Sequence, residues 1–290
     1  MAALHGIIPI VYTPFDADGR IIEADVRRLV EHLIAAGAHG LAAVGGASEA
    51  LKLTLDERRW LAALVAEQAA GRVPVIVGVS ALNTADAVTL ARHAAQLGAR
   101  AVFATPALAG PATPRALRYH YAAIADAGAP VMVQDAEISV GPAQMARLAE
   151  EIPGIQYAKE EAPLDSGHRI SEILRLTEGR LTVLSGGAYL LDDLARGAAG
   201  AIPGSIGVAD LARAYDLWRA GDRAGARRAY DHFTPLSFFR RQFPLLAAKE
   251  VLRRQGVFSA AYLREPAQHV MDERDLDELT TIMETMGSPY

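Results

Sequence analysis

Lysine is rare in this sequence, and one of its lysines lies where it could do chemistry. The chain contains 29 lysine and arginine residues, and only three of them are lysines: Lys52, Lys159 and Lys249. Lys159 ends the apolar run IQYAK, and two glutamates follow it. An amine at the end of a buried strand loses solvation, which favours its neutral form. A neutral amine can condense with a carbonyl group to form a Schiff base.

Side chains alternate along a strand, so Lys159 and Glu161 would share one face while Glu160 would point the other way. A structural alternative for Lys159 stays open, in which its ammonium lies at a strand end and pairs with Glu160. Lys52 follows a loop and Lys249 lies in a helical pattern, so we expect structural roles for both.

Eight short apolar segments alternate with longer segments of helical period, such as 54–71 and 83–98. The short segments are apolar on both faces, which is typical of strands buried in a parallel sheet. They are 6–15, 40–46, 73–80, 101–106, 130–135, 155–160, 181–187 and 198–204. This alternation predicts an α/β fold, a (β/α)8 TIM barrel, over residues 1–209. Residues 210–290 read as helices without strands, and we expect them to form a helical extension packed on the barrel.

The composition is that of a soluble globular protein, with 51% hydrophobic and 22% charged residues. A net charge of −5 argues against a nucleic-acid partner, and the absence of cysteine excludes disulfides and thiolate catalysis. The histidine spacing does not favour a metal site. The N-terminus lacks a basic start, and no run of about 18 apolar residues exists. We therefore expect a cytoplasmic protein with no metal and no membrane partner.

In a TIM barrel the active site lies at the carboxyl ends of the strands. Those ends give the candidate site residues of this chain besides Lys159. They are Gly46, Ala47 and Ser48 after the second strand, Gln134 and Asp135 on the fifth, Glu161 after the sixth and Gly186 after the seventh.

The chain resembles the dihydrodipicolinate synthase and N-acetylneuraminate lyase family in the order of its motifs. These are GIIPIVYTPFDADGRI, VGGASEALKLT, PVIVGVS, PVMVQD, QYAKEEA and VLSGG. The resemblance covers the whole barrel and the C-terminal helices. It implies a class I enzyme, usually a homotetramer, in which Lys159 forms a Schiff base with a small 2-oxo acid. No external cofactor is implied, because the lysine supplies the electron sink.

The second strand departs from the family pattern. Most members end it in Gly-Thr-Thr-Gly-Glu, which holds the carboxylate of the 2-oxo acid, whereas this chain has GGASE at 45–49. By resemblance, the backbone amides of Gly46 and Ala47 and the hydroxyl of Ser48 would bind that carboxylate. The alternative is that GGASE is merely a tight turn that caps the next helix.

The fifth strand departs further. Gln134 replaces the family's proton-relay tyrosine and Asp135 the asparagine, while Ser139 stands where the synthases carry an arginine for a second carboxylate. Ala107 and Leu108 replace a second relay tyrosine. A glutamine can orient a hydroxyl or carbonyl but cannot transfer protons at neutral pH. Asp135 either orients a loop through hydrogen bonds or acts as a second acid or base. Dihydrodipicolinate synthesis is therefore not expected.

The combination of Val-Gln-Asp-Ala on the fifth strand and Lys-x-Glu on the sixth resembles the branch that dehydrates L-2-keto-3-deoxyarabonate. The same branch has Ser-Glu at the end of the second strand and Arg-Gln then Ala-Lys near the C-terminus, as at 48–49, 241–242 and 248–249 here. In this hypothesis Glu161 is the residue that exchanges protons with the substrate; its structural alternative is an ion pair with an arginine. Two other functions stay open. One is a class I aldolase that releases pyruvate and an aldehyde, with Asp135 or a water as base. The other is a non-catalytic barrel that binds a 2-oxo acid.

Overall fold

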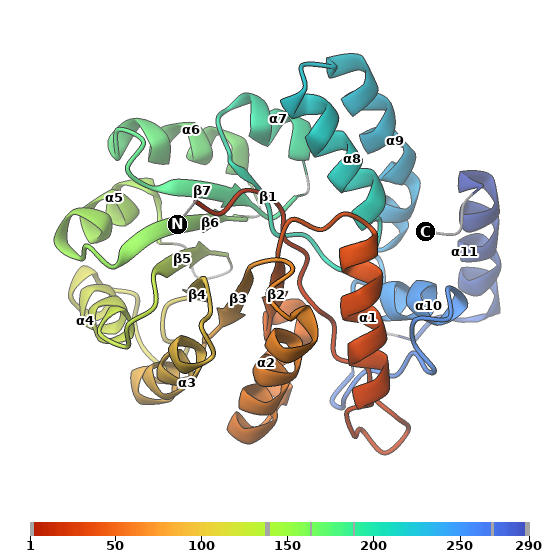
Figure 1. Cartoon of the computed structure of the whole chain (residues 1–290), viewed down its shortest axis with the longest axis horizontal. Helices are drawn as coiled ribbons and strands as arrows, with labels where there is room; N and C mark the ends of the chain where they lie inside the picture. Colours follow the sequence, from red (N-terminus) through yellow and green to blue (C-terminus); the bar gives the residue numbers. More distant parts are fainter. Residues whose placement is uncertain (1–2, 137–139, 163, 188, 268–269, 288–290) are drawn as a thin grey trace.

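The computed structural model in Figure 1 describes residues 3–136, 140–162, 164–187, 189–267 and 270–287. Eight parallel strands form one sheet in the order β1-β8-β7-β6-β5-β4-β3-β2. The strands are β1 (Gly6–Ile7), β2 (Leu41–Ala43), β3 (Val75–Gly78), β4 (Ala101–Ala104), β5 (Val131–Asp135), β6 (Ile155–Glu160), β7 (Thr182–Ser185) and β8 (Gly200–Ala201). A parallel bridge between Ile10 and Ala42 joins the segment after β1 to β2 and closes the sheet. The predicted (β/α)8 barrel is thus confirmed.

Helices follow the strands and surround them (Figure 1). They are α1 (Glu23–Ala35), α2 (Leu55–Ala69), α3 (Thr84–Gln96), α4 (Pro114–Ala125), α5 (Pro142–Glu151), α6 (Ser166–Leu176), α7 (Leu190–Ala195) and α8 (Val208–Arg219). Two of these helices begin at capping residues: the side chain of Thr54 accepts a hydrogen bond from the amide of Glu57, and that of Asn83 from the amide of Asp86. Two short 3-10 helices, η1 (Gly46–Ser48) and η2 (Ala50–Lys52), lie between β2 and α2.

The side chains of the strands form two separate apolar clusters. Met132, Tyr157 and Leu184 belong to a buried cluster inside the barrel. The intervening residues of the same strands belong to a second cluster, which the helices cover. Because side chains alternate, Gln134 and Lys159, each two residues after an interior residue, extend the interior face to the carboxyl end of the barrel.

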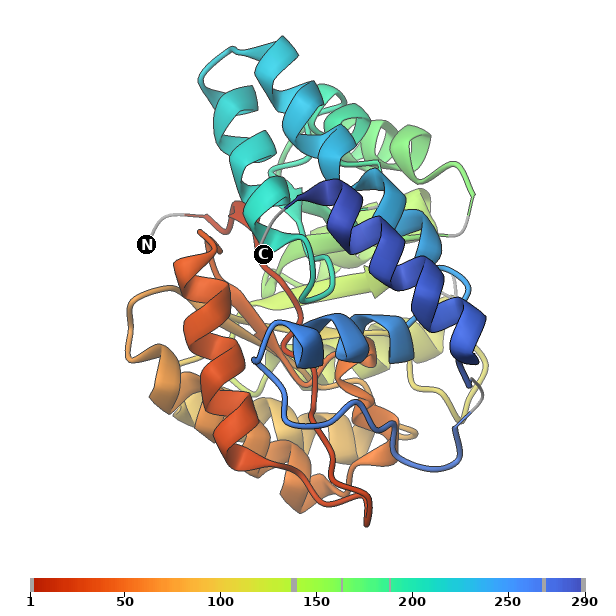
Figure 2. The same ribbon diagram turned by 90° about the vertical axis from the view of Figure 1, so that its right-hand side faces the viewer.

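The chain after the barrel continues as α9 (Arg223–Phe239), α10 (Leu246–Arg254) and α11 (Glu273–Met286). Helix α9 packs against α8, and α11 packs against α9. Figures 1 and 2 show α9, α10 and α11 together on one side of the barrel. Helix α8 begins at Val208 and packs on β1, so the predicted domain boundary at 209/210 falls in its first turn. None of the described helices is long and apolar enough to cross a membrane.

Candidate active site

Lys159 and Glu161 form an ion pair at the carboxyl end of the barrel. The Lys159 side chain is almost fully buried, and its Nζ lies 2.8 Å from Oε2 of Glu161. Glu160 points to the opposite side and pairs with Arg169, with 3.1 Å between Oε1 and Nε. The structural alternative in which Lys159 pairs with Glu160 is therefore wrong. Glu161 likewise pairs with this lysine rather than with an arginine.

Gln134 holds the other oxygen of Glu161. Gln134 lies opposite Lys159 in the register of β5 and β6, and its side-chain amide donates a hydrogen bond to Oε1 of Glu161. The backbone amide of Glu161 donates to the carbonyl of Asp135 at 3.0 Å. The carboxylate of Glu161 is thus fixed between an amide and an ammonium group, while 26% of its side chain stays exposed.

Gly186 has no side chain, and Glu161 occupies the space where one would lie. Its amide donates to the carbonyl of Glu160 at 3.0 Å, which extends the pairing of β6 with β7. A Cβ built on Gly186 would lie 2.8 Å from Cβ of Glu161, closer than real Cβ atoms approach one another. A side chain here would push Glu161 away from Lys159, so position 186 requires glycine.

Asp135 does not share the face of Lys159, because it lies opposite Glu160 in the strand register. Its carboxylate is fully buried and accepts hydrogen bonds from the amides of Val140, at 3.0 Å, and Gly141, at 3.2 Å. These contacts agree with the alternative in which Asp135 orients a loop through hydrogen bonds, and not with the one in which it acts on the substrate. Ser139, which the family comparison singled out, lies outside the described residues.

Arg169, on α6, contacts both outward-facing carboxylates, those of Asp135 and Glu160. Burial raises the pKa of Glu160 to about 7, although the Ala162 amide and Arg169 act in the opposite direction. The guanidinium thus ties the ends of β5 and β6 together directly behind Gln134 and Lys159. The role of Arg169 could not be predicted from the sequence, because its approach to the strands depends on the path of the loop before α6.

The turn after β2 is the 3-10 helix η1. In the described structure, the amides of Gly46 and Ala47 have no hydrogen-bond partner, as is normal for the first residues of a helix. The Ser48 hydroxyl accepts from the Gly45 amide at 3.1 Å and donates to the carbonyl of Val11 at 2.6 Å. Its proton therefore fixes the turn, while the two amides remain able to bind an anion. The segment GGASE does form a tight turn that ends at Glu49, the N-cap residue of η2, whereas the N-cap of α2 is the threonine at position 54.

Two adjoining hollows lie at the carboxyl end of the barrel, and Glu161 lines one of them. One of about 400 Å³ is lined by Glu161, His168 and Asp192 among others. A neighbouring one of about 450 Å³ shares Gly186, Tyr189 and Arg241 with the first. A substrate attached to Lys159 would have room for its distal carbons and hydroxyls along this path. Arg241 is one of the residues that carry the predicted branch resemblance.

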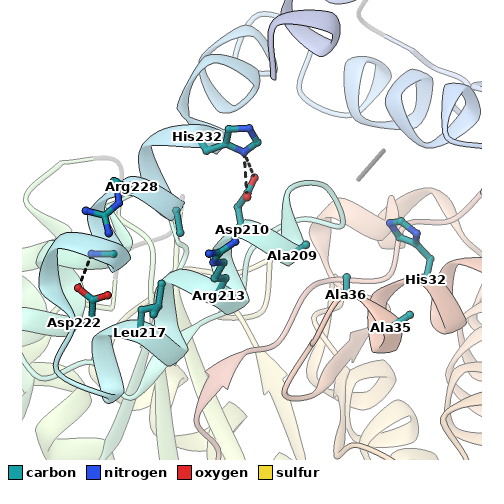
Figure 3. Close-up of a pocket in the computed structure, with 12 residues that line it drawn as sticks. His32, Ala35, Ala36, Ala209, Asp210, Arg213, Leu217, Asp222, Arg228 and His232 are labelled. Atoms are coloured by element: carbon teal, nitrogen blue, oxygen red, sulfur yellow. Dashed lines mark hydrogen bonds and ion pairs between the residues drawn. The ribbon is translucent and has the colours of Figure 1, made fainter. Parts of the chain in front are cut away.

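A further hollow of about 720 Å³ lies elsewhere, between α1, α8 and α9 (Figure 3). The Nδ1 of His232 lies 3.1 Å from Oδ2 of Asp210 at its wall. Asp222 accepts a hydrogen bond from the Gly225 amide at 2.7 Å. None of the predicted site residues lines this hollow, so the predicted chemistry belongs to the barrel mouth.

The other two lysines have the structural contacts that the sequence analysis expects. The Nζ of Lys249 lies 2.6 Å from Oε1 of Glu49, and the Nζ of Lys52 lies 2.9 Å from Oε2 of the same carboxylate. Burial lowers the pKa of Lys249 to about 8, although the neighbouring Glu49 raises it. All three lysines are paired, and Lys159 is distinguished by its partner: Glu161 lines a hollow at the barrel mouth.

The comparison with known proteins agrees with this geometry. A model of the dihydrodipicolinate synthetase family matches residues 3–286. The chain is 35% identical over 273 residues to the L-2-keto-3-deoxyarabonate dehydratase of Azospirillum brasilense, which covers 90% of this chain and 88% of that protein. It is 36% identical over 243 residues to the 4-hydroxy-tetrahydrodipicolinate synthase of Acidithiobacillus ferrooxidans, with coverages of 80% and 81%.

Solved structures share the whole fold. The prophage protein YagE of E. coli K12, a member of the dihydrodipicolinic acid synthase family crystallised with pyruvate, superposes with a TM-score of 0.91 at 26% identity. That match covers 98% of this chain and 99% of YagE. A dihydrodipicolinate synthase superposes with a TM-score of 0.89, also at 26% identity, over 98% of this chain and 99% of that one. The chain therefore belongs to the dihydrodipicolinate synthetase family and is a lyase of the class I aldolase-like type.

Proposed function

We propose that this protein dehydrates a 2-keto-3-deoxy sugar acid, such as L-2-keto-3-deoxyarabonate, through a Schiff base on Lys159. The observation that carries the proposal is the carboxylate of Glu161, 2.8 Å from Nζ of Lys159. Gln134 stands where a relay tyrosine would be expected, so Glu161 is the group placed to move protons. The similarity to a dehydratase of that substrate supports the same reaction.

In the first step Glu161 takes a proton from the ammonium of Lys159, and the neutral amine attacks C2 of the substrate. Glu161 returns this proton to the C2 oxygen, which leaves as water, so that Glu161 is ionised again and an iminium ion remains. The iminium ion withdraws electrons from C3. The carbon C3 is two bonds from the nitrogen, so the carboxylate that contacts Nζ also lies near the C3 protons. This proximity lets one carboxylate serve both proton transfers.

In the second step the ionised Glu161 removes a proton from C3 and an enamine forms. The enamine expels the C4 hydroxyl, which takes the proton from Glu161 and leaves as water. The unsaturated imine then tautomerises and is hydrolysed by water, which frees Lys159. For L-2-keto-3-deoxyarabonate the product is 2-oxoglutarate semialdehyde.

The remaining groups would position the substrate. The amides of Gly46 and Ala47 would hold its carboxylate, since unpaired amides at a helix start bind anions. Gln134 would keep the carboxylate of Glu161 in line with C3 and orient the C4 hydroxyl. Asp135 acts from behind the strand, through the loop that it holds.

Borohydride trapping tests the proposal directly. The protein is incubated with L-2-keto-3-deoxyarabonate, reduced with borohydride and digested, while semialdehyde and pyruvate are assayed separately. We expect a reduced adduct on Lys159 together with semialdehyde. Release of pyruvate instead would make the protein an aldolase, and an adduct without any product would make it a non-catalytic binding barrel. A protein that traps no 2-oxo acid on Lys159 would refute the Schiff-base mechanism.

A further inference from the structure

A buried charge cluster joins the turn after β2 to the C-terminal helix α10. Glu49 directly follows η1 and adopts a left-handed backbone conformation, with φ of 56° and ψ of 34°. This conformation is unfavourable for a residue with a side chain, so surrounding contacts must hold it. Glu49 itself is buried, with 5% of its surface exposed.

Three donors from distant parts of the chain bind the carboxylate of Glu49. Oε1 accepts a hydrogen bond from Nζ of Lys249 at 2.6 Å. Oε2 accepts from Nζ of Lys52 at 2.9 Å and from the backbone amide of Arg264 at 3.2 Å. Two of these donors, Lys249 and Arg264, belong to the extension that follows the barrel.

Lys249 has several contacts besides the one with Glu49. Its side chain is fully buried, and Nζ also donates to the carbonyl of Tyr262 at 2.8 Å. The ammonium lies 4.5 Å from the ring centroid of Phe15, within the range of a cation–π contact. Burying an ion pair costs desolvation free energy that its attraction barely offsets. A pair in this position therefore contributes more to defined geometry than to stability.

Glu49 also closes the turn that contains η1. The backbone amide of Glu49 donates to the carbonyl of Gly46 at 2.9 Å. A shift of Glu49 would therefore move the peptide group that joins Gly46 to Ala47. The amides of these two residues have no hydrogen-bond partner among the described residues.

We infer that Lys249 is a positioning residue for substrate binding: through Glu49 it holds the amides of Gly46 and Ala47 toward the carboxylate of the 2-oxo acid. The inference rests on the proposed function for the role of these amides. It makes the C-terminal extension part of the binding machinery, although Lys249 itself touches no substrate.

The test uses the double variant Glu49→Gln/Lys249→Met, because Glu49→Gln alone would leave the buried charge of Lys249 without its carboxylate and could prevent folding. Glu250→Gln is the matched control. Glu250 is the neighbour of Lys249 on α10, is similarly buried and pairs with Arg253 and Arg254, so its loss perturbs the helix without touching the turn. Pyruvate is titrated against each protein, and the fraction of Lys159 trapped by borohydride gives the half-saturating concentration.

We expect this concentration to rise about tenfold in the double variant, with complete trapping at saturation, and to stay within about twofold of the wild type in the control. A folded double variant with wild-type half-saturation would overturn the inference. Hydrogen exchange of the peptide spanning 45–49, measured without pyruvate, gives a second readout that we expect to be faster in the double variant alone. If the wild-type protein trapped neither pyruvate nor L-2-keto-3-deoxyarabonate, the Schiff-base mechanism of the proposed function would fail. Unchanged exchange in the double variant would separately overturn the positioning role.

Discussion

The carboxylate of Glu161 lies 2.8 Å from Nζ of Lys159, on a strand end where both side chains face the same side of the barrel. In the proposed reaction this pairing would give the amine an adjacent proton acceptor when it attacks the substrate. It would also place a base beside C3, the carbon that the iminium ion acidifies. The side-chain amide of Gln134 fixes the second oxygen of this carboxylate and cannot compete for its proton.

Glu161→Gln separates the two tasks of this carboxylate. The amide keeps the size of the side chain but cannot remove a proton from C3, so we expect turnover of L-2-keto-3-deoxyarabonate to fall by a factor of about 10² to 10⁴. Schiff-base formation needs only a neutral amine, so borohydride should still trap the substrate on Lys159 after longer incubation. Turnover within a few-fold of the wild type would show that another group is the base.

Lys159→Arg keeps the positive charge beside Glu161 but removes the nucleophile, because guanidinium stays protonated. We expect neither turnover nor a reduced adduct with pyruvate, as measured by intact mass. Lys52 and Lys249 remain in this variant and serve as internal controls, since both are paired with Glu49. An adduct that survived in Lys159→Arg would place the Schiff base on one of them.

The sequence was sufficient to predict the barrel and the shared face of Lys159 and Glu161. The alternation of apolar strands with capped helices predicts the eight βα units, and the period of two along a strand places Lys159 and Glu161 on one face. Both predictions use only residues that are close together in the sequence, and the strands of the closed sheet keep this alternation of side chains. The predicted separation of Glu160 from Lys159 has the same origin.

Contacts between distant segments could not be predicted in this way. Arg169 reaches Asp135 and Glu160 only because the loop before α6 brings the helix over two strand ends. Lys249 was correctly expected to be structural, but its partner Glu49 is 200 residues away in the sequence. The predicted homotetramer and cytoplasmic location remain predictions.

Arg241→Gln tests where the distal part of the substrate binds. Arg241 lines both hollows at the carboxyl end of the barrel, and a charged hydrogen bond to a substrate hydroxyl contributes about 1.5–3 kcal/mol. We expect KM for L-2-keto-3-deoxyarabonate to rise at least about tenfold, while the half-saturating concentration of pyruvate, which lacks C4 and C5, stays unchanged. Arg228→Gln, which alters the separate hollow of Figure 3, is the control. Equal effects on both ligands would contradict this assignment.

Glu160 should make the stability of the protein depend on pH. Burial raises the pKa of its carboxyl from 4.5 to about 7 in the folded chain. Between these two values the folded state binds more protons than the unfolded state, so the free energy of unfolding falls as pH rises. Over the whole window the loss is on the order of 3 kcal/mol. Glu160→Gln removes this titration, so urea unfolding between pH 4.5 and 8 should show a flatter profile for the variant.

Asp193→Asn provides the comparison for that experiment, because burial raises the pKa of Asp193 from 3.8 only to about 6. The ionisation of Asp193 should also lower the free energy of unfolding as pH rises, but it should be complete at a lower pH than that of Glu160. Between pH 6 and 7 the difference between wild type and Glu160→Gln should therefore change more steeply than the difference between wild type and Asp193→Asn. Parallel profiles for wild type and Glu160→Gln across this interval would mean that Arg169 keeps Glu160 ionised in the folded protein. Arg169 and Glu160 would then form an ion pair across this whole pH range.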